Sequence, residues 1–165
     1  EAIKERRGEK RPDTPDPTIE VEIDAYIDEG YISDPAQKVE IYKKIAAVSS
    51  LSEADEVEEE IEDRFGDLPE AVRNLLEISR LKVLAKQLGI ETITSERGEI
   101  VARFLPGLSL DAERIASLLV NSRAQVRYQS GRQQMLKWRM AGRSTAELWK
   151  LIKDSLLYLF NDETA

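Results

Sequence analysis

The chain has 165 residues, of which 41% are hydrophobic and 34% are charged, and its formal net charge is -8 at pH 7. This length and composition predict one domain with a hydrophobic core, and the acidic balance excludes a protein whose whole surface binds nucleic acid. The sequence contains no histidine and no cysteine. Histidine bases, thiol nucleophiles, Cys/His zinc sites and disulfides are therefore excluded.

Residues 1–18 are predicted to form an arm or linker. Residues 1–10 are highly charged and lack the apolar core of a signal peptide. Residues 11–18 contain three prolines, which fix φ and remove backbone donors. Because the chain does not begin with methionine, we expect it to be a piece of a longer protein. No run of residues approaches the roughly 18 apolar residues that a membrane span needs.

One strand and three helices are predicted before residue 90. Residues 19–27 alternate apolar and mostly acidic side chains, the pattern of a half-buried strand. A first helix should begin after Asp34 and Pro35, which suit the cap and the first helical position. A second helix is expected to begin at Ser52 and to end at Gly66. A third should follow residues 67–69 and continue to Gly89.

The second half of the chain predicts two hairpins and two helices. The hairpins pair residues 91–95 with 99–104, and residues 124–129 with 133–139. A short helix is expected over residues 111–120, and a capping box at Ser144 and Glu147 should open a final helix that ends near residue 160. The order β-ααα-ββ-α-ββ-α predicts an α+β fold, with several helices packed on a small antiparallel sheet.

The densest charge lies on the predicted second helix and the turn after it. Residues 52–70 include ten acidic residues and one basic residue, Arg64. Helical spacing predicts one acidic face that carries Glu53, Glu56, Glu60 and Asp63. Such a face has three interpretations: a solvated surface, a docking surface for a basic partner, or a divalent metal site. The metal site is the least favoured, because carboxylates on one straight helix do not converge on an ion.

A second constellation is basic. Residues 123–143 include six arginine or lysine residues and no acidic residue, with Tyr128 and Trp138 interleaved. Basic strands that carry aromatic residues are one way to build a nucleic-acid platform. The candidate contacts are Arg127, Arg132, Lys137 and Arg139. The alternative is that the aromatic rings pack in the core while the basic groups offset the acidic helices.

Nothing in the sequence predicts a catalytic centre. Neither G-x-x-x-x-G-K-[ST] nor G-x-G-x-x-G occurs, so a P-loop ATPase cannot reside in this stretch. No serine is paired with a lysine in a recognisable motif. We therefore expect this fragment to have no enzyme activity, no cofactor and no metal of its own.

Residues 19–90 resemble the C-terminal regulatory domain of bacterial transcription-repair coupling factors. The stretches that carry the resemblance are IEVEIDAYI followed by QKVEIYKKIA, and EEEIEDRFGDLPEAVRNLLEISRLKVLAKQLGI. Its most specific parts are residues 37–45 and residues 63–66 with Pro69. The sequence departs from the family at Asp28, where proline is frequent. Beyond residue 90 only the element order and the terminal helix are similar.

The resemblance implies a parent protein that uses ATP and Mg²⁺ to translocate on duplex DNA. This parent would displace stalled RNA polymerase, recruit the damage-recognition subunit of nucleotide-excision repair, and work in the bacterial cytoplasm. The arm would be the end of the preceding motor. The fragment itself is expected to be monomeric and to have no membrane contact.

For this domain the resemblance implies autoinhibition by docking on the N-terminal excision-repair-homology module of the same chain. Docking would mask the surface that recruits the damage-recognition subunit. Glu60 and Asp63 are the expected docking residues, because the family's carboxylates at the matching positions face that module. Glu56 and Glu59 are second choices. The alternatives are a nucleic-acid-contacting accessory module that uses residues 123–143, and a structural cap on the motor.

Overall fold

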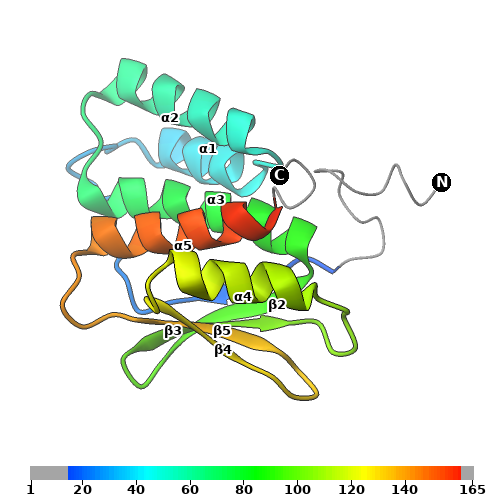
Figure 1. The fold of residues 1–165 in the computed structure, drawn as a ribbon. Coiled ribbons are helices and arrows are strands. Elements are labelled where there is room, and N and C mark those ends of the chain that lie inside the picture. Colours follow the sequence, from blue (N-terminus) through cyan, green and yellow to red (C-terminus); the bar gives the residue numbers. More distant parts are fainter. Residues whose placement is uncertain (1–14, 161–165) are drawn as a thin grey trace. The chain divides into compact units, whose positions relative to one another are not determined.

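The computed structural model describes residues 15–160, so most of the predicted arm lies outside the described residues. Within them, five helices and five strands follow the predicted order (Figure 1). The α+β class is therefore confirmed. The chain divides into two compact units. Within the described residues, one unit is residues 23–83, and the other combines residues 15–22 with residues 84–160.

The unit of residues 23–83 is built on helices α1 (Pro35–Ala46), α2 (Leu51–Phe65) and the greater part of α3 (Glu70–Leu88). Asp34 caps α1, as predicted, by accepting a hydrogen bond of 2.9 Å from the backbone N–H of Gln37. The predicted start of α2 at Ser52 is one position late, because the helix begins at Leu51. Its N-cap is Ser50, whose hydroxyl accepts a hydrogen bond of 3.0 Å from the Glu53 N–H.

The strand predicted over residues 19–27 is shorter than expected, since β1 contains only Thr18–Glu20. The later apolar residues of the alternating run serve the helical unit instead. The backbone N–H of Ile27 donates a hydrogen bond of 2.8 Å to the Tyr42 hydroxyl of α1. The side-chain amide of Asn74 in α3 donates one of 2.8 Å to the Asp24 carbonyl. Side chains thus satisfy backbone groups that a neighbouring strand would otherwise pair.

The core of the helical unit is almost wholly aliphatic. Because its isoleucines and leucines recur at helical spacing on α1, α2 and α3, each helix turns one apolar stripe inward. The buried residues are Ile27, Ile32, Ile41, Ile45, Ile61, Leu68, Val72 and Leu76.

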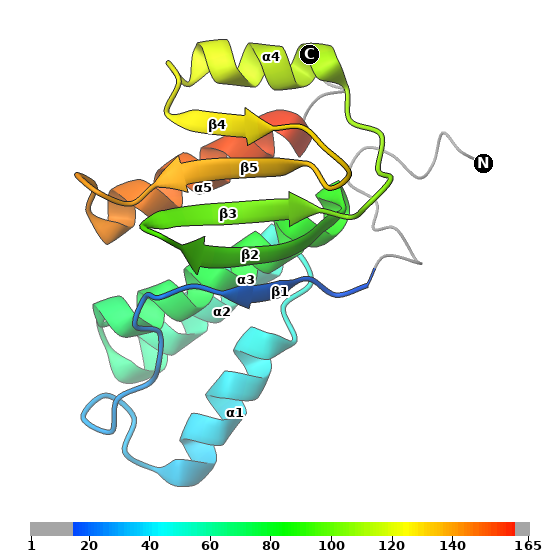
Figure 2. The same cartoon turned by 90° about the horizontal axis from the view of Figure 1, so that it is seen from below.

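The other unit is built on a five-stranded sheet in the order β1-β2-β3-β5-β4 (Figure 2). The strands that join β1 are β2 (Ile90–Glu96), β3 (Glu99–Phe104), β4 (Val126–Gln129) and β5 (Met135–Arg139). These four are antiparallel to one another, as predicted, and both hairpins are confirmed. The sheet as a whole is mixed, because β1 joins its edge in parallel, with Ile19 opposite Ile93.

Two helices complete this unit. Helix α5 (Thr145–Phe160) lies against one face of the sheet (Figure 1). There the Trp138 indole N–H donates a hydrogen bond of 3.1 Å to the Ser155 hydroxyl. Helix α4 (Ala112–Asn121) lies beside β4 (Figure 2). The predicted capping box is confirmed, because Ser144 and Glu147 exchange hydrogen bonds of 2.9 and 3.1 Å between their backbone N–H groups and side chains.

Candidate docking surface

The acidic side chains of α2 form three rows, which differ in what they contact. Ala54 and Ile61 turn toward the core, so the helical period places Glu56, Glu59 and Asp63 on the opposite side. All three are exposed, and none lies within 4.0 Å of a lysine or arginine nitrogen among residues 15–160. We call these three residues the acidic crest.

The second row faces α1 and contains Glu60. The Glu60 carboxylate accepts hydrogen bonds of 2.6 Å from Lys44 and 3.0 Å from Arg64. Glu40 of α1 lies 3.9 Å from Lys44 and 3.4 Å from Arg64. The bond from Lys44, with a smaller effect of Arg64, lowers the pKa of Glu60 below its ordinary value. Glu60 is therefore at the border of the acidic face and already has two cationic partners.

The third row faces α3, and two of its carboxylates share the single guanidinium of Arg80. This guanidinium is largely buried and donates hydrogen bonds of 2.8 Å to Asp55 and 2.7 Å to Glu58. It also lies 3.7 Å from Glu77 on its own helix. Burial alone would lower the pKa of Arg80, but the bonds with Glu58 and Asp55 raise it above its ordinary value. Arg80 thus joins two turns of α2 to α3.

The end of α2 is fixed by a turn that glycine allows. Gly66 has φ 93° and ψ -173°, a conformation that other residues rarely adopt. The Tyr31 hydroxyl donates a hydrogen bond of 2.6 Å to the Gly66 carbonyl. The centroids of the Tyr31 and Phe65 rings lie 6.0 Å apart. The Arg64 guanidinium lies over the Phe65 ring at 5.0 Å. These contacts hold the crest beside a defined helix end.

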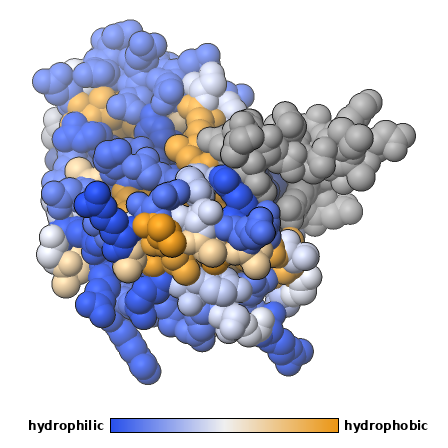
Figure 3. Space-filling model, in the orientation of Figure 1, coloured by the Kyte–Doolittle hydropathy of each residue, from blue (hydrophilic) through white to orange (hydrophobic). Residues whose placement is uncertain are grey.

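The structure separates the predicted docking residues into two kinds. Asp63, Glu56 and Glu59 belong to the crest, whereas Glu60 belongs to the row that α1 neutralises. Much of the surface over α2 is hydrophilic (Figure 3). Sequence reasoning missed Lys44 and Arg80 as partners of this helix. The spacing from Glu60 to Arg64 could have indicated one ion pair, but no local pattern indicates a partner on another helix.

The basic segment does not combine its charges with exposed aromatic rings. Trp138 is fully buried and lies opposite Val126 and Ile100, on the face that α5 covers. Arg127 and Lys137 lie opposite each other on the other face, where Arg127 forms an ion pair with Glu99. Arg132 and Arg139 are exposed. Stacking on Trp138 is therefore not available, and nucleic-acid contact through the basic residues stays a prediction.

The face of the sheet opposite α5 carries a further ion pair. Arg103 of β3 donates two hydrogen bonds to Glu96 of β2, one of them 2.9 Å long. Together with a hydrogen bond from Thr94, this pair lowers the pKa of Glu96 to about 2. Within residues 15–160, no group of three or more acidic side chains is arranged to hold a metal ion. No helix in that range is both long and apolar enough for a bilayer crossing.

Comparison with known families matches residues 21–115 to the TRCF domain. This chain belongs to the TRCF domain family. This chain is 38% identical over 101 residues to the transcription-repair-coupling factor of Bacillus subtilis (strain 168). It is 42% identical over 95 residues to that of Staphylococcus epidermidis. These matches cover 61% and 56% of this chain but only 9% and 8% of those relatives.

A solved structure supports the same fold beyond the region of sequence identity. This chain superposes on the crystal structure of the C-terminal domain of a transcription-repair coupling factor with a TM-score of 0.76. The match covers 89% of this chain and 96% of that one, at 24% sequence identity. The resemblance inferred from residues 19–90 is therefore confirmed, and the fold it implied extends over the hairpins and final helix.

Proposed function

We propose that this TRCF domain is the C-terminal regulatory domain of a bacterial transcription-repair coupling factor. It docks on the N-terminal excision-repair-homology module of the same protein and masks the surface that recruits the damage-recognition subunit. Family membership supports this proposal, and the relatives named above are themselves transcription-repair-coupling factors. In this proposal, ATP, Mg²⁺, duplex DNA and RNA polymerase are bound by the rest of the parent protein.

The acidic crest is the observation that carries the docking proposal. Its three carboxylates are exposed on one side of α2 and have no lysine or arginine within ion-pair distance among residues 15–160. By contrast, Glu60 is paired with Lys44 and Arg64, and Asp55 and Glu58 share Arg80. An uncompensated row of like charges is unfavourable for the isolated helix, and a basic partner surface would relieve it. Exposed ion pairs are individually weak and are screened by salt. They therefore suit a contact that must be released when the motor engages.

The crest also refines which side chains make the contact. Glu59 and Asp63 lie one helical turn apart and are assigned direct contacts with arginine or lysine side chains of the module. Glu56 extends the same row toward the start of α2. Glu60 can join the contact only by exchanging or sharing Lys44 and Arg64, because both already hold its carboxylate.

The test measures binding of this domain to the rest of the parent protein by titration calorimetry at two salt concentrations. Reversal of the crest with Glu59→Lys and Asp63→Lys should weaken binding at low salt and flatten its salt dependence. The matched control reverses Glu29 and Asp154, which are exposed acidic residues outside α2, with the same change in net charge. Equal affinity of the crest variant and the control would contradict the assignment of the crest.

Two measurements separate the alternative functions. Fluorescence anisotropy with duplex and single-stranded DNA tests the accessory nucleic-acid module, which requires binding that disappears with Arg132→Glu and Arg139→Glu. Deletion of residues 19–165 from the parent tests the structural cap. A cap predicts a less stable motor with unchanged ATPase activity, whereas autoinhibition predicts a rise in ATPase activity and in binding of the damage-recognition subunit.

A further inference from the structure

The outward side of α4 is both exposed and apolar. Ile115 and Leu118 turn inward and are buried. On the opposite side Val120 is 75% exposed, more than any other large hydrophobic residue among residues 15–160. No charged side chain occurs over residues 115–122, in a chain of which 34% is charged. Apolar residues on both sides are typical of a helix that is covered on both sides.

Val120 belongs to a continuous apolar surface. Ala112 and Ala116 precede it at steps of four residues, which places all three on the outward side, and both alanines are exposed. Figure 3 shows a hydrophobic patch over α4. We call Ala112, Ala116 and Val120 the α4 stripe. Its alanines are short and allow another helix to approach closely, whereas Val120 needs a recess in the partner.

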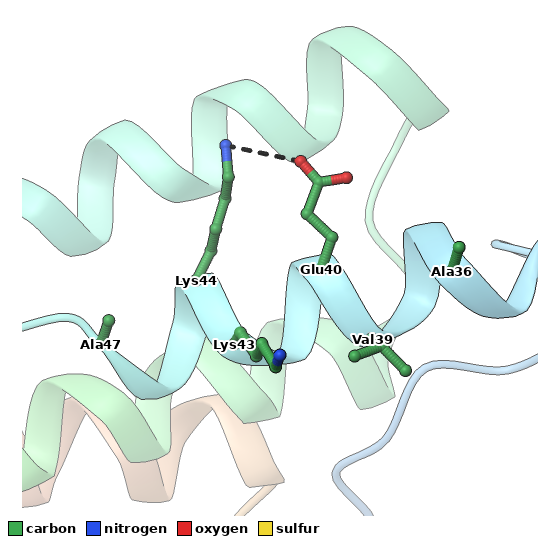
Figure 4. A pocket seen from close by; sticks show the side chains of 6 residues that line it. All are labelled: Ala36, Val39, Glu40, Lys43, Lys44 and Ala47. Carbon is green, nitrogen blue, oxygen red and sulfur yellow. Dashed lines mark ion pairs between the residues drawn. The ribbon is translucent and has the colours of Figure 1, made fainter.

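The exposed Val39 of α1 has different surroundings. Glu40, Lys43 and Lys44 lie beside it on the same helix, and Figure 4 marks the ion pair of Glu40 with Lys44. Val39 is thus a single apolar side chain among charged groups, which is normal on a protein surface. Val120 instead lies in a stretch without charges, so its exposure calls for an explanation.

The two ends of the stripe carry opposite charges. Glu113 lies near its start and Arg123 just beyond its end. Both are exposed, and neither forms an ion pair with another residue in the described range. The remaining charged residue of α4, Arg114, lies over the Tyr158 ring at 4.3 Å and donates a hydrogen bond to the Tyr158 carbonyl. A uniformly acidic or basic segment, or a phosphate backbone, would meet a like charge at one end.

A second copy of α4 in antiparallel orientation matches both the charges and the sizes. Leu118 is midway in sequence between Glu113 and Arg123, and also midway between Ala116 and Val120. With a two-fold axis at the level of Leu118, Glu113 of each copy meets Arg123 of the other. Val120 of each copy then lies against the short Ala116. Such an isologous contact uses the same surface twice.

We propose that the α4 stripe is a self-association surface, which pairs with the stripe of a second copy of this chain in antiparallel orientation. The contact is apolar in the middle and is closed at each end by an ion pair of Glu113 with Arg123. One pair of short helices buries less than the roughly 800 Å² per partner of a standard interface. We therefore expect a weak dimer, with a dissociation constant of roughly 0.1 mM.

This inference is independent of the proposed function, because the acidic crest has no part in it. It changes one expectation from the sequence, since the isolated domain would be monomeric only in dilute solution. Crest reversal with Glu59→Lys and Asp63→Lys should therefore leave self-association at moderate salt unchanged.

Sedimentation equilibrium tests the charge match, at protein concentrations about tenfold below and above the expected dissociation constant. Glu113→Arg and Arg123→Glu should each weaken the dimer about five- to tenfold, because each substitution places like charges at both ends of the contact. The double variant has the net charge of the unaltered chain and restores both ion pairs in reverse, so the dimer should recover. Val120→Asn should weaken it about tenfold, since two valines are lost per dimer.

Disulfide cross-linking tests the position of the two-fold axis. The sequence contains no cysteine, so a single introduced thiol reports which surface meets its own copy. Ser117 is exposed and is adjacent in sequence to Leu118. Ser117→Cys should therefore form linked dimers in the presence of oxidised glutathione, and adding Val120→Asn should slow their formation. The matched control is Ser52→Cys, at an exposed position of α2, which should form linked dimers much more slowly.

Circular dichroism checks that each variant is folded. A chain that stays monomeric throughout, with Ser117→Cys cross-linking no faster than Ser52→Cys, would overturn the inference. A dimer that is insensitive to Val120→Asn, or that the double charge reversal fails to restore, would belong to another surface and would equally overturn the contact through α4. Either result leaves the docking of the acidic crest untouched.

Discussion

The Lys44 ammonium group on α1 lies 2.6 Å from the Glu60 carboxylate on α2. The same carboxylate lies 3.0 Å from Arg64, one turn further along α2. Glu60 is therefore part of the contact between two helices of the domain, whereas Asp63 makes no ion pair with any other residue in the described range. Two residues that the sequence presented as equivalent thus have different surroundings, and they should respond differently to substitution.

Neutralising these two residues should affect the free energy of unfolding differently. Glu60→Gln removes a half-exposed ion pair and should lower the free energy of unfolding by about 0.5 kcal/mol. Asp63→Asn removes one member of a like-charged row and should leave stability unchanged or raise it by a few tenths of a kcal/mol, since like charges at helical spacing repel. Urea unfolding at low salt measures both. A greater loss from Asp63→Asn than from Glu60→Gln would contradict the assignment of rows.

Arg80 should be the most sensitive charged residue of the helical unit. Arg80→Met leaves Asp55, Glu58 and Glu77 without their shared cation, and we expect a loss of about 2 kcal/mol, below the range for fully buried pairs because Asp55 is largely exposed. Arg80→Lys should recover part of the loss. Arg73→Met, at an exposed position of α3, is the control. Equal urea midpoints for the Arg73 and Arg80 variants would show that the buried guanidinium contributes nothing.

The pair of Glu96 and Arg103 should make stability depend on acid pH. The hydrogen bonds from Arg103 and Thr94 lower the pKa of Glu96 from 4.5 to about 2. A group whose pKa is lower in the folded state contributes stability above its unfolded pKa and loses it as the pH falls toward the folded value. The contribution is therefore complete above about pH 5 and is lost toward pH 2.

Urea unfolding between pH 2 and pH 7 tests this dependence. Because Glu96 is partly exposed, we expect Glu96→Gln to remove about 1 kcal/mol at pH 7 and much less at pH 2. The free energies of unfolding of Glu96→Gln and of the unaltered chain could instead differ by the same amount at pH 2 and at pH 7. That result would contradict the ion pair as the cause of the difference.

Gly66 should tolerate no side chain without a cost in backbone strain. A Cβ at this position would meet no atom within 4 Å, so the loss comes from φ 93° and ψ -173° rather than from a clash. We expect Gly66→Ala to lower the free energy of unfolding by roughly 1–3 kcal/mol. Glu29→Ala is the control, because Glu29 is exposed and lies outside the helices and strands. A smaller effect at Gly66 than at Glu29 would contradict this explanation.

Local signals were sufficient for most of the secondary structure. Asp34 and Ser144 cap their helices as predicted, and Gly66 ends α2. These features depend on side chains that hydrogen-bond to backbone groups within a few residues. The predicted strand over residues 19–27 was too long. Period-two alternation indicates which side chains are buried, but it does not indicate whether the backbone has a neighbouring strand.

The docking surface was only half predictable. The density of carboxylates and their helical spacing indicated an acidic face on α2, and both features are properties of the sequence alone. Tertiary structure decided which carboxylates remain uncompensated. Lys44 is 16 residues from Glu60, and Arg80 is 22 residues from Glu58. Helical periodicity relates residues three or four positions apart, whereas these partners meet only because the packing of the apolar stripes brings α1 and α3 against opposite sides of α2.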